Sequence, residues 1–486
     1  MGQTVPSATG LNRRDFLRVA GASAAAACLA PGTLAGEAAA PKPRRPNVVF
    51  LLADQWRAQA TGYAGDPNVK TPHLDALAPR SHNLVNAVSG CPVCSPYRAS
   101  LVTGRYPLTH GVFLNDVCLS TEAVSLADAF NRAGYQTAYI GKWHLDGHGR
   151  SAFIPPERRQ GFKFWRVAEC THDYNRSHYH GDSDEKRFWD GYDAIAQTDE
   201  ACRYIRNHAA GPFLLVLSWG PPHNPYQTAP AEFRQRYRPP EIQLRPNVPE
   251  QATTGARTDL AGYYAHCSAL DACVGRIART LTEAGIEDDT VLVFTSDHGD
   301  MLGSHGESRK QKPWDESIRV PFLLRWPAGL GREGRRLVTP INTPDIMPTL
   351  LGLCGIDVPK TAEGQDRSPL LRGQAADGDD AALIACPSPF GEWARPRGRE
   401  YRGIRTTRYT FVRSLDGPWL LFDNQADPHQ LTNLCGRPES ATLQAELDAR
   451  LRECLRQRRD EFLPGPDYIR RWGYKTDANG TVPYTS

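Results

Sequence analysis

Four runs of apolar residues recur along the chain between residues 46 and 300, separated by longer stretches with helical periodicity. The runs are continuous rather than alternating, which is typical of strands that helices cover on both faces. They occupy residues 47–52, 136–140, 213–219 and 290–296. The pattern predicts an α/β fold with a mixed, mostly parallel central sheet flanked by helices.

Helical periodicity fills much of the chain between and after these runs. In residues 125–133, Leu126, Ala129 and Phe130 fall on one face, and Gly134 marks the end of the helix. Further helices are predicted at 74–78, 199–208, 260–284, 345–354 and 440–459, and a short strand at 321–325. Residues 147–193 are rich in aromatic residues, His and Arg without clear periodicity, so they predict a long insertion near the site.

The pattern changes after about residue 371. An Ala-, Asp- and Gly-rich stretch is typical of a boundary, and short alternating runs before the last helix predict an antiparallel sheet. We expect a small C-terminal antiparallel α+β subdomain. The predicted domains are residues 1–45, 46–372 and 383–486, and the short strands are 402–405, 409–413 and 419–422.

The first 45 residues resemble an export signal. Arg13 and Arg14, with Phe16 and Leu17, precede an Ala-rich apolar run, as in twin-arginine signals. This run is too short to span a bilayer comfortably, and no later run is long enough. We expect a periplasmic or secreted protein that uses the export machinery and has no stable membrane span. Cys28 leaves a lipoprotein interpretation open.

Charge and cysteine content narrow the functional classes. A net charge of +3 with 23% charged residues gives no reason to expect a nucleic-acid partner. Of the 12 cysteines, Cys28 leaves with the signal, and the scattered remainder does not look like a disulfide scaffold. No second Cys or His pair stands at the spacing of a zinc site.

Cys94 is the candidate reactive centre. Proline at position 96 predicts an extended Ser95 and a helix that begins at Pro96, just after Cys94 and with Arg98 within reach. Backbone N–H groups, the helix dipole and a guanidinium would then converge on one thiol, which describes an anion site. A buried structural cysteine and a disulfide with Cys91 remain the alternatives.

Each of the four apolar runs ends in polar residues. Carboxyl ends of parallel strands share one sheet edge, so these side chains are predicted to meet. Carboxylates, an amide oxygen and an imidazole suit a divalent cation; three cationic side chains suit an anionic group, and two histidines suit proton transfer. The first set is Asp54, Gln55, Asp297 and His298, the second Arg98, Lys142 and Lys310, and the third His144 and His223. Together they predict sulfuryl or phosphoryl transfer.

The segment Cys94-Ser95-Pro96-Tyr97-Arg98 resembles the C-x-P-x-R signature of type I sulfatases in the alkaline-phosphatase superfamily. Other family motifs follow in the same order over roughly residues 46–440. They are Gly141-Lys142-Trp143-His144, Pro222-His223, Ser296-Asp297-His298-Gly299 and Glu316 to Pro321. The resemblance implies a sulfuric ester hydrolase.

The resemblance also implies roles for the site residues. A formylglycine-generating enzyme would oxidise Cys94 to formylglycine, whose hydrate attacks sulfur. His223, with or without Lys310, would protonate the departing alcohol, and His144 would take the proton that releases sulfate. Arg98 and Lys142 would hold the formylglycine. Lys310 is favoured over Lys312 because it stands nine positions before Arg319, the spacing in the family.

The implied metal is bound by Asp54, Gln55, Asp297, His298 and residue 94. Many family members carry two adjacent aspartates where this chain has Asp54 and Gln55, so Mn²⁺ stands beside Ca²⁺ as a candidate ion. The Gln and His combination is also similar to phosphonate monoester hydrolases, in which Asn115 would match a substrate-contacting asparagine. Phosphonate monoester or phosphodiester hydrolysis is therefore the alternative function.

A third hypothesis is a non-catalytic carbohydrate-binding protein in which Cys94 is never converted. The full set of acid, base and cationic residues argues against it. The expected substrate is a sulfated small molecule or glycan, because the insertion has aromatic and polar groups suited to sugars, although such groups also serve packing. These groups are Trp165, His172, Asp173, Tyr174, His178, Tyr179 and Trp189.

Overall fold

The computed structural model describes residues 1–2 and 45–484, and the elements described below lie within residues 45–484. The predicted twin-arginine signal and Cys28 lie outside the described residues. Among the described residues, no helix combines the length and apolar character that a bilayer crossing needs.

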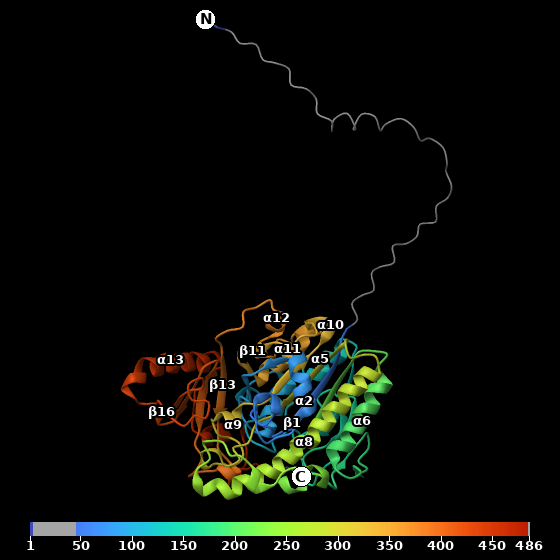
Figure 1. Ribbon diagram of the computed structural model, residues 1–486, viewed down its shortest axis with the longest axis horizontal. Coiled ribbons are helices and arrows are strands. Elements are labelled where there is room, and N and C mark those ends of the chain that lie inside the picture. Colours follow the sequence, from blue (N-terminus) through green and yellow to red (C-terminus); the bar gives the residue numbers. More distant parts are fainter. Residues whose placement is uncertain (3–44, 485–486) are drawn as a thin grey trace, which may run out of the picture. The chain divides into compact units, whose positions relative to one another are not determined.

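A mixed, mostly parallel sheet of eight strands forms the centre of the fold (Figure 1). Its order is β11-β2-β10-β9-β1-β8-β4-β5, and only β10 runs antiparallel to its neighbours. All four predicted buried strands are present side by side, which confirms the fold class. The strands are β1 (Asn47–Asp54), β2 (His82–Leu84), β4 (Gln136–Lys142), β5 (Phe164–Ala168), β8 (Phe213–Pro222), β9 (Thr290–Ser296), β10 (Phe322–Arg325) and β11 (Arg336–Leu337).

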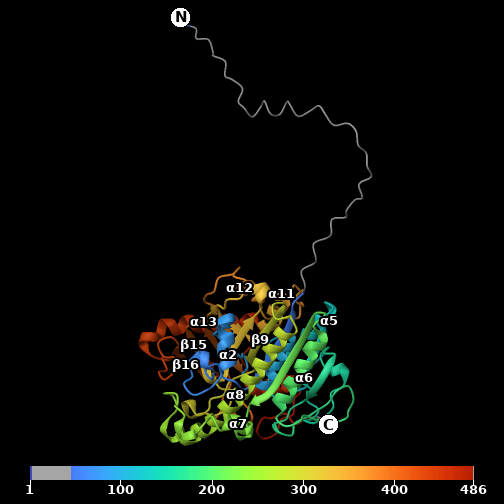
Figure 2. The same ribbon diagram turned by 45° about the vertical axis from the view of Figure 1, so that its right-hand side comes forward.

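Both faces of the sheet are covered, which explains why its central strands are apolar without alternation. Alternate residues of β1 point into two cores: Val48, Phe50 and Leu52 into one, and Val49, Leu51 and Ala53 into the other. The first core is covered by α3 (Cys94–Thr103), α5 (Leu126–Arg132) and α11 (Thr343–Leu353). The second is covered by α2 (Pro72–Leu77), α6 (Asp193–His208) and α8 (Thr253–Glu283), and α6 and α8 lie side by side in Figure 2.

A separate four-stranded antiparallel sheet lies toward the C-terminus, in orange and red in Figure 1. It consists of β13 (Ala381–Cys386), β14 (Tyr401–Thr406), β15 (Tyr409–Ser414) and β16 (Gly417–Asp423). Helix α13 (Ala441–Gln457) packs on it through Leu447, Leu451 and Leu455. The predicted subdomain is therefore present, whereas the domain boundaries themselves stay a prediction.

The structure corrects several predicted elements. Helix α3 begins at Cys94 rather than at Pro96, because the first turn of a helix has no internal acceptor for its N–H groups and so tolerates proline at its third residue. Strand β5 lies within the predicted insertion, whose sequence shows no clear periodicity. Other elements were not predicted either, among them the short strands β2 and β11, strand β13, whose Ala-rich run has low strand propensity, and α14 (Gly465–Trp472).

Candidate active site

The polar residues at the strand ends converge on Cys94, as predicted. Asp54 is the last residue of β1 and Asp297 directly follows β9, while Lys310 comes from the loop beyond. The Cys94 Sγ atom lies 3.2 Å from Lys310 Nζ, 3.2 Å from His298 Nε2 and 3.6 Å from Asp54 Oδ1. Segments far apart in sequence thus form one buried cluster around the first residue of α3.

The loop that leads into α3 is fixed by contacts on three sides. The Ser89 hydroxyl donates to the Asp297 carbonyl at 2.6 Å, and the Ala385 N–H donates to Gly90 O at 2.7 Å. The Gln311 N–H donates to Pro92 O at 3.1 Å. Both sheets and the Lys310 loop therefore position Cys94, which suits a site that needs accurate placement of its reacting atom.

Arg98 lies behind Cys94 and holds the strand ends together. Its guanidinium donates to Asp54 Oδ2 at 3.2 Å, to Asp297 Oδ2 at 3.1 Å and to Ser218 Oγ at 2.6 Å. Lys142 Nζ lies 2.5 Å from Asp54 Oδ2. Buried ion pairs are tolerated when hydrogen bonds satisfy the charged groups, and both terminal nitrogens of Arg98 have such partners, whereas its Nε has none within the described residues. Ser218 was not predicted as a site residue, although it lies in β8, one of the strands that end at this cluster.

The geometry of β4 depends on Gly141. A Cβ atom at this position would lie 2.0 Å from the carbonyl oxygen of Ser218 on β8, and the residue has φ of +104°. Only glycine fits such a close backbone approach. The close approach that Gly141 allows places Lys142, the next residue of β4, in the cluster.

A metal ion fits the donor set beside Cys94. Ligand atoms of Asp54, Cys94, Asp297 and His298 all lie within 4.8 Å of one another. Gln55 Nε2 donates to Asp300 at 2.6 Å, while the buried Oε1 atom of Gln55 has no hydrogen-bond partner within the described residues. A buried acceptor without a partner is costly, and a cation would satisfy it. Oxygen and imidazole donors of this kind match a divalent ion.

The charges of the two aspartates agree with this fit. Burial and the neighbouring Asp54 carboxylate raise the pKa of Asp297. Burial opposes ionisation of Asp54 as well, yet Lys142 and the other cations hold its pKa well below its usual range. A bound cation would remove the repulsion between the two carboxylates.

Lys310 and His223 form a pair on one side of Cys94. Lys310 Nζ lies 2.9 Å from His223 Nε2, and His223 Nδ1 lies 2.8 Å from the Asn224 carbonyl. Burial and the Lys310 charge hold the pKa of His223 well below its usual range. Neutral His223 therefore donates from Nδ1 and accepts from Lys310, so the proton of this pair is carried by Lys310.

His144 is paired with Asp116, which was not predicted. His144 Nε2 lies 2.7 Å from Asp116 Oδ1, and both side chains are buried. Burial disfavours the charged ring, but the Cys170 thiolate and the Asp116 contact outweigh it and raise the pKa of His144 to about 10. The only signal in the sequence was that Asp116 follows the candidate Asn115.

Asn115 makes no hydrogen bond to Cys94 within the described part of the chain. Its Oδ1 accepts from the Ser95 N–H at 3.1 Å, so it satisfies a free donor in the first turn of α3. Lys312 donates to Ser308 O at 2.6 Å, away from Cys94, in agreement with the choice of Lys310. Cys91 and Cys94 are both free thiols, so the disulfide alternative is wrong.

The aromatic residues of the insertion serve packing more than expected. Trp165 and Tyr174 are fully buried in the two cores. His172, which is only partly buried, stacks on His223 with ring centroids 4.5 Å apart. His172 therefore lies next to the candidate site, whereas Trp165 and Tyr174 have no exposed surface for a sugar.

The sheet topology, together with a buried Cys94 among carboxylates, imidazoles and cations, is typical of hydrolases of the alkaline-phosphatase superfamily. The Sulfatase family model matches residues 46–356, and the model of the N-sulphoglucosamine sulphohydrolase C-terminal region matches residues 303–457. The chain belongs to the sulfatase family and is a sulfuric ester hydrolase.

Individual relatives agree with this assignment. The chain is 46% identical to an ulvan-active sulfatase of Formosa agariphila, over 91% of this chain and 88% of the relative. It is 31% identical to an endo-4-O-sulfatase of Bacteroides thetaiotaomicron, over 85% and 91% of the two chains. A solved Bacteroides thetaiotaomicron structure, described with the metabolism of multiple glycosaminoglycans, is 28% identical with a TM-score of 0.78, and the match covers 88% of this chain and 99% of that one.

Proposed function

We propose that this enzyme hydrolyses sulfate esters on a sulfated saccharide, using formylglycine formed from Cys94. The observation that carries the proposal is the position of Cys94, which lies within 3.8 Å of two lysines and beside a set of metal ligands. The saccharide is supported by the names of similar proteins, which refer to ulvan and to N-sulphoglucosamine.

Residue 94, once converted and hydrated, supplies the attacking hydroxyl, and a metal ion held beside it would supply polarisation of the sulfate oxygens. Lys142 and Arg98 hold residue 94 in place and offset negative charge. Lys310 delivers a proton to the departing alcohol, and His223 orients Lys310 through their 2.9 Å contact. In its neutral form, which the raised pKa makes the major form only at alkaline pH, His144 accepts the proton that accompanies sulfate release, and Asp116 stabilises the charged ring that results.

The ligands proposed for the metal are Asp54, Gln55, Asp297 and His298, with residue 94 beside them. Ca²⁺ fits three oxygen donors best, and Mn²⁺ tolerates the imidazole more readily. The proposed partners for maturation are a formylglycine-generating enzyme, which reads the segment from Cys94 to Arg98, and the export machinery. The proposed location is the periplasm or the exterior.

A turnover screen tests this function. Protein co-expressed with a formylglycine-generating enzyme is assayed on an aryl sulfate and on sulfated mono- and disaccharides of defined position, with Cys94→Ala as the inactive control. We expect turnover of the aryl sulfate and of at least one saccharide. Absence of turnover on every sulfate ester by converted protein would contradict the proposal.

Phosphonate monoester or phosphodiester hydrolysis is the second candidate activity. It is favoured by Gln55, which lies at the metal site where many sulfatases carry a carboxylate, and by Asn115 near the start of α3. The same screen includes an aryl phosphonate and a phosphate diester. A kcat/KM higher for either than for the aryl sulfate would reverse the order of the two activities.

A further inference from the structure

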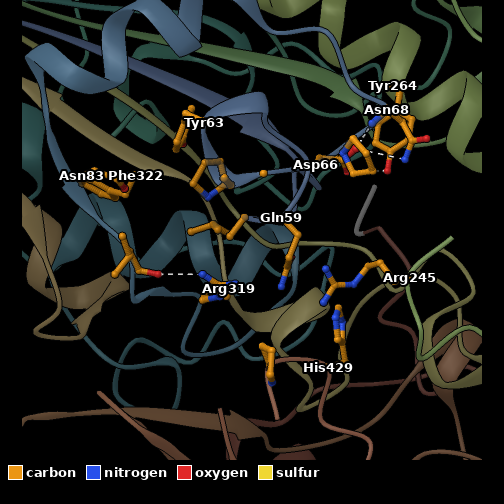
Figure 3. Close-up of a pocket in the computed structure, with 18 of the residues that line it drawn as sticks. Gln59, Tyr63, Asp66, Asn68, Asn83, Arg245, Tyr264, Arg319, Phe322 and His429 are labelled. Atoms are coloured by element: carbon orange, nitrogen blue, oxygen red, sulfur yellow. Dashed lines mark hydrogen bonds between the residues drawn. The ribbon is translucent and has the colours of Figure 1, made fainter. Parts of the chain in front are cut away.

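A polar cavity of about 580 Å³ lies outside the catalytic cluster (Figure 3). None of the candidate catalytic or metal-binding residues lines it. Its walls come from the loop after β1, strand β2, the edge strand β11, the start of β10, helix α8 and residues 428–429, which follow the C-terminal sheet. Its size falls within the range of small-molecule sites.

Gln59 is the residue that points to a ligand. It is only 8% exposed, and neither its Nε2 nor its Oε1 has a hydrogen-bond partner within the described residues. Figure 3 shows it between Arg319 and Arg245, with His429 nearby. The loop is held in place because the neighbouring Ala58 N–H donates to the Arg319 carbonyl at 2.9 Å. A buried amide with both groups unpaired is costly unless a ligand or water satisfies it.

The cavity is also lined by cationic groups. Arg319 donates to Val85 O at 3.1 Å through Nη1 and faces Asp315, and Arg245 contacts Glu316 through Nε at 3.0 Å. These contacts fix the two guanidinium groups and leave further N–H donors of each without an acceptor among the described residues. Arg336 is exposed and pairs with no carboxylate in the described part of the chain.

Glu316 and Asp315 offset the charges of Arg245 and Arg319, so Arg336 is the arginine of the described lining whose charge no carboxylate offsets. Asp66, the one carboxylate in the lining described by the structure, already accepts from the Asn68 and Val69 N–H groups and from the Tyr264 hydroxyl. Asp315 is shared with a further arginine, Arg405, at 3.0 Å. The arginine N–H groups that have no acceptor among the described residues therefore make the cavity favourable for an anionic ligand.

We propose that this cavity binds a saccharide unit that carries a sulfate or carboxylate group, away from the catalytic centre. Hydroxyl groups both donate and accept hydrogen bonds, which matches the paired donor and acceptor of Gln59, and guanidinium groups bind sulfate or carboxylate through two parallel hydrogen bonds. The inference rests on the proposed saccharide function. One saccharide unit would lie at the catalytic centre and a second unit of the same substrate in this cavity, so that a longer saccharide is bound at two places.

Calorimetric titration of the full chain tests the proposal. The parent is Cys94→Ala, which cannot turn over substrate, and the probes are cellobiose, its 6-sulfate, cellobiouronic acid and inorganic sulfate. Gln59→Leu removes the amide at nearly constant volume, and Arg336→Ala removes an exposed cation with little risk to folding. Arg132→Ala, an exposed arginine on α5, is the matched control.

We expect each cavity variant to weaken binding of an anionic disaccharide by about tenfold, with the control unchanged, because each loses a hydrogen bond to a charged or polar group. Cellobiose is expected to bind at least about tenfold more weakly. Equal affinity of both cavity variants and the parent, or of cellobiose and its anionic forms, would overturn the proposal. Inorganic sulfate bound as tightly as the sulfated disaccharide would also overturn it, because the saccharide would then contribute nothing.

Aryl sulfate turnover separates this proposal from the proposed function. Converted protein with Arg336→Ala is expected to turn over the aryl sulfate at the parent rate, since Arg336 lies outside the catalytic cluster. Loss of saccharide binding in the cavity variants, combined with no sulfatase activity in the converted parent, would support the cavity and reject the catalytic proposal.

Discussion

Replacement of Asp116 by Asn isolates one step of the proposed reaction. Asp116 Oδ1 lies 2.7 Å from His144 Nε2, and the two side chains are 5% and 3% exposed. Asn keeps the shape and an acceptor but removes the charge that stabilises protonated His144. The loss of a charge-assisted hydrogen bond is worth about 1.5 to 3 kcal/mol, which corresponds to a decrease in kcat of about ten- to hundredfold.

Because His144 is assigned to sulfate release and not to the first transfer, the decrease should fall on the second step. In stopped-flow assays with an aryl sulfate, converted Asp116→Asn protein is expected to release one equivalent of phenol rapidly and then turn over slowly. Asp182→Asn, at a 76% exposed carboxylate, is the control and should match the parent. A normal steady-state rate in Asp116→Asn, or equal slowing of the first phenol release, would refute the assignment.

The proton donor, the metal ligands and a buried histidine each give a further prediction. Lys310→Ala should lower kcat/KM by at least about hundredfold for an alkyl sulfate and less for a nitrophenyl sulfate, whose leaving group needs no proton; equal losses on both would contradict the role of Lys310. Chelator treatment should abolish turnover, and Gln55→Leu should weaken metal retention by about tenfold in equilibrium dialysis followed by elemental analysis; unchanged retention would remove Gln55 from the ligand set. Burial lowers the pKa of His110 from 6.5 to about 3, so the folded state resists protonation that the unfolded chain accepts. Stability should therefore be full above pH 6.5 and fall on acidification, by about 3 kcal/mol down to pH 4, and His110→Asn, measured by denaturant unfolding, should lack this part of the slope; an identical slope would show that His110 is not the group responsible.

The central sheet could be predicted because its strands are buried on both faces. Residues 47–52 and 290–296 read as uninterrupted apolar runs, and the latter matches β9 residue for residue. The edge strands β5 and β13 were harder to predict from the sequence. Strand β5 is only five residues long and lies within an insertion without clear periodicity, and β13 is rich in alanine, which has low strand propensity.

The candidate site was predictable where a residue ends a strand or belongs to the sulfatase signature. Cys94, Arg98, Lys142 and Asp297 meet because the topology places strand ends on one edge. Asp116 and Ser218 could not be assigned in the same way, since their role lies in a hydrogen bond to another side chain across more than twenty residues of sequence. Asn115 was suggested as a substrate contact only by the resemblance to phosphonate monoester hydrolases; its Oδ1 accepts from the backbone of α3, and the substrate contact stays a prediction.

The state of residue 94 tests the central claim most directly. Preparations made with increasing amounts of a formylglycine-generating enzyme are analysed by mass spectrometry of the peptide that contains residue 94, and aryl sulfate turnover is measured on the same samples. The proposed function predicts activity that rises in proportion to the aldehyde fraction at residue 94 and vanishes when only thiol is present. Full activity in protein that carries only the Cys94 thiol would contradict it.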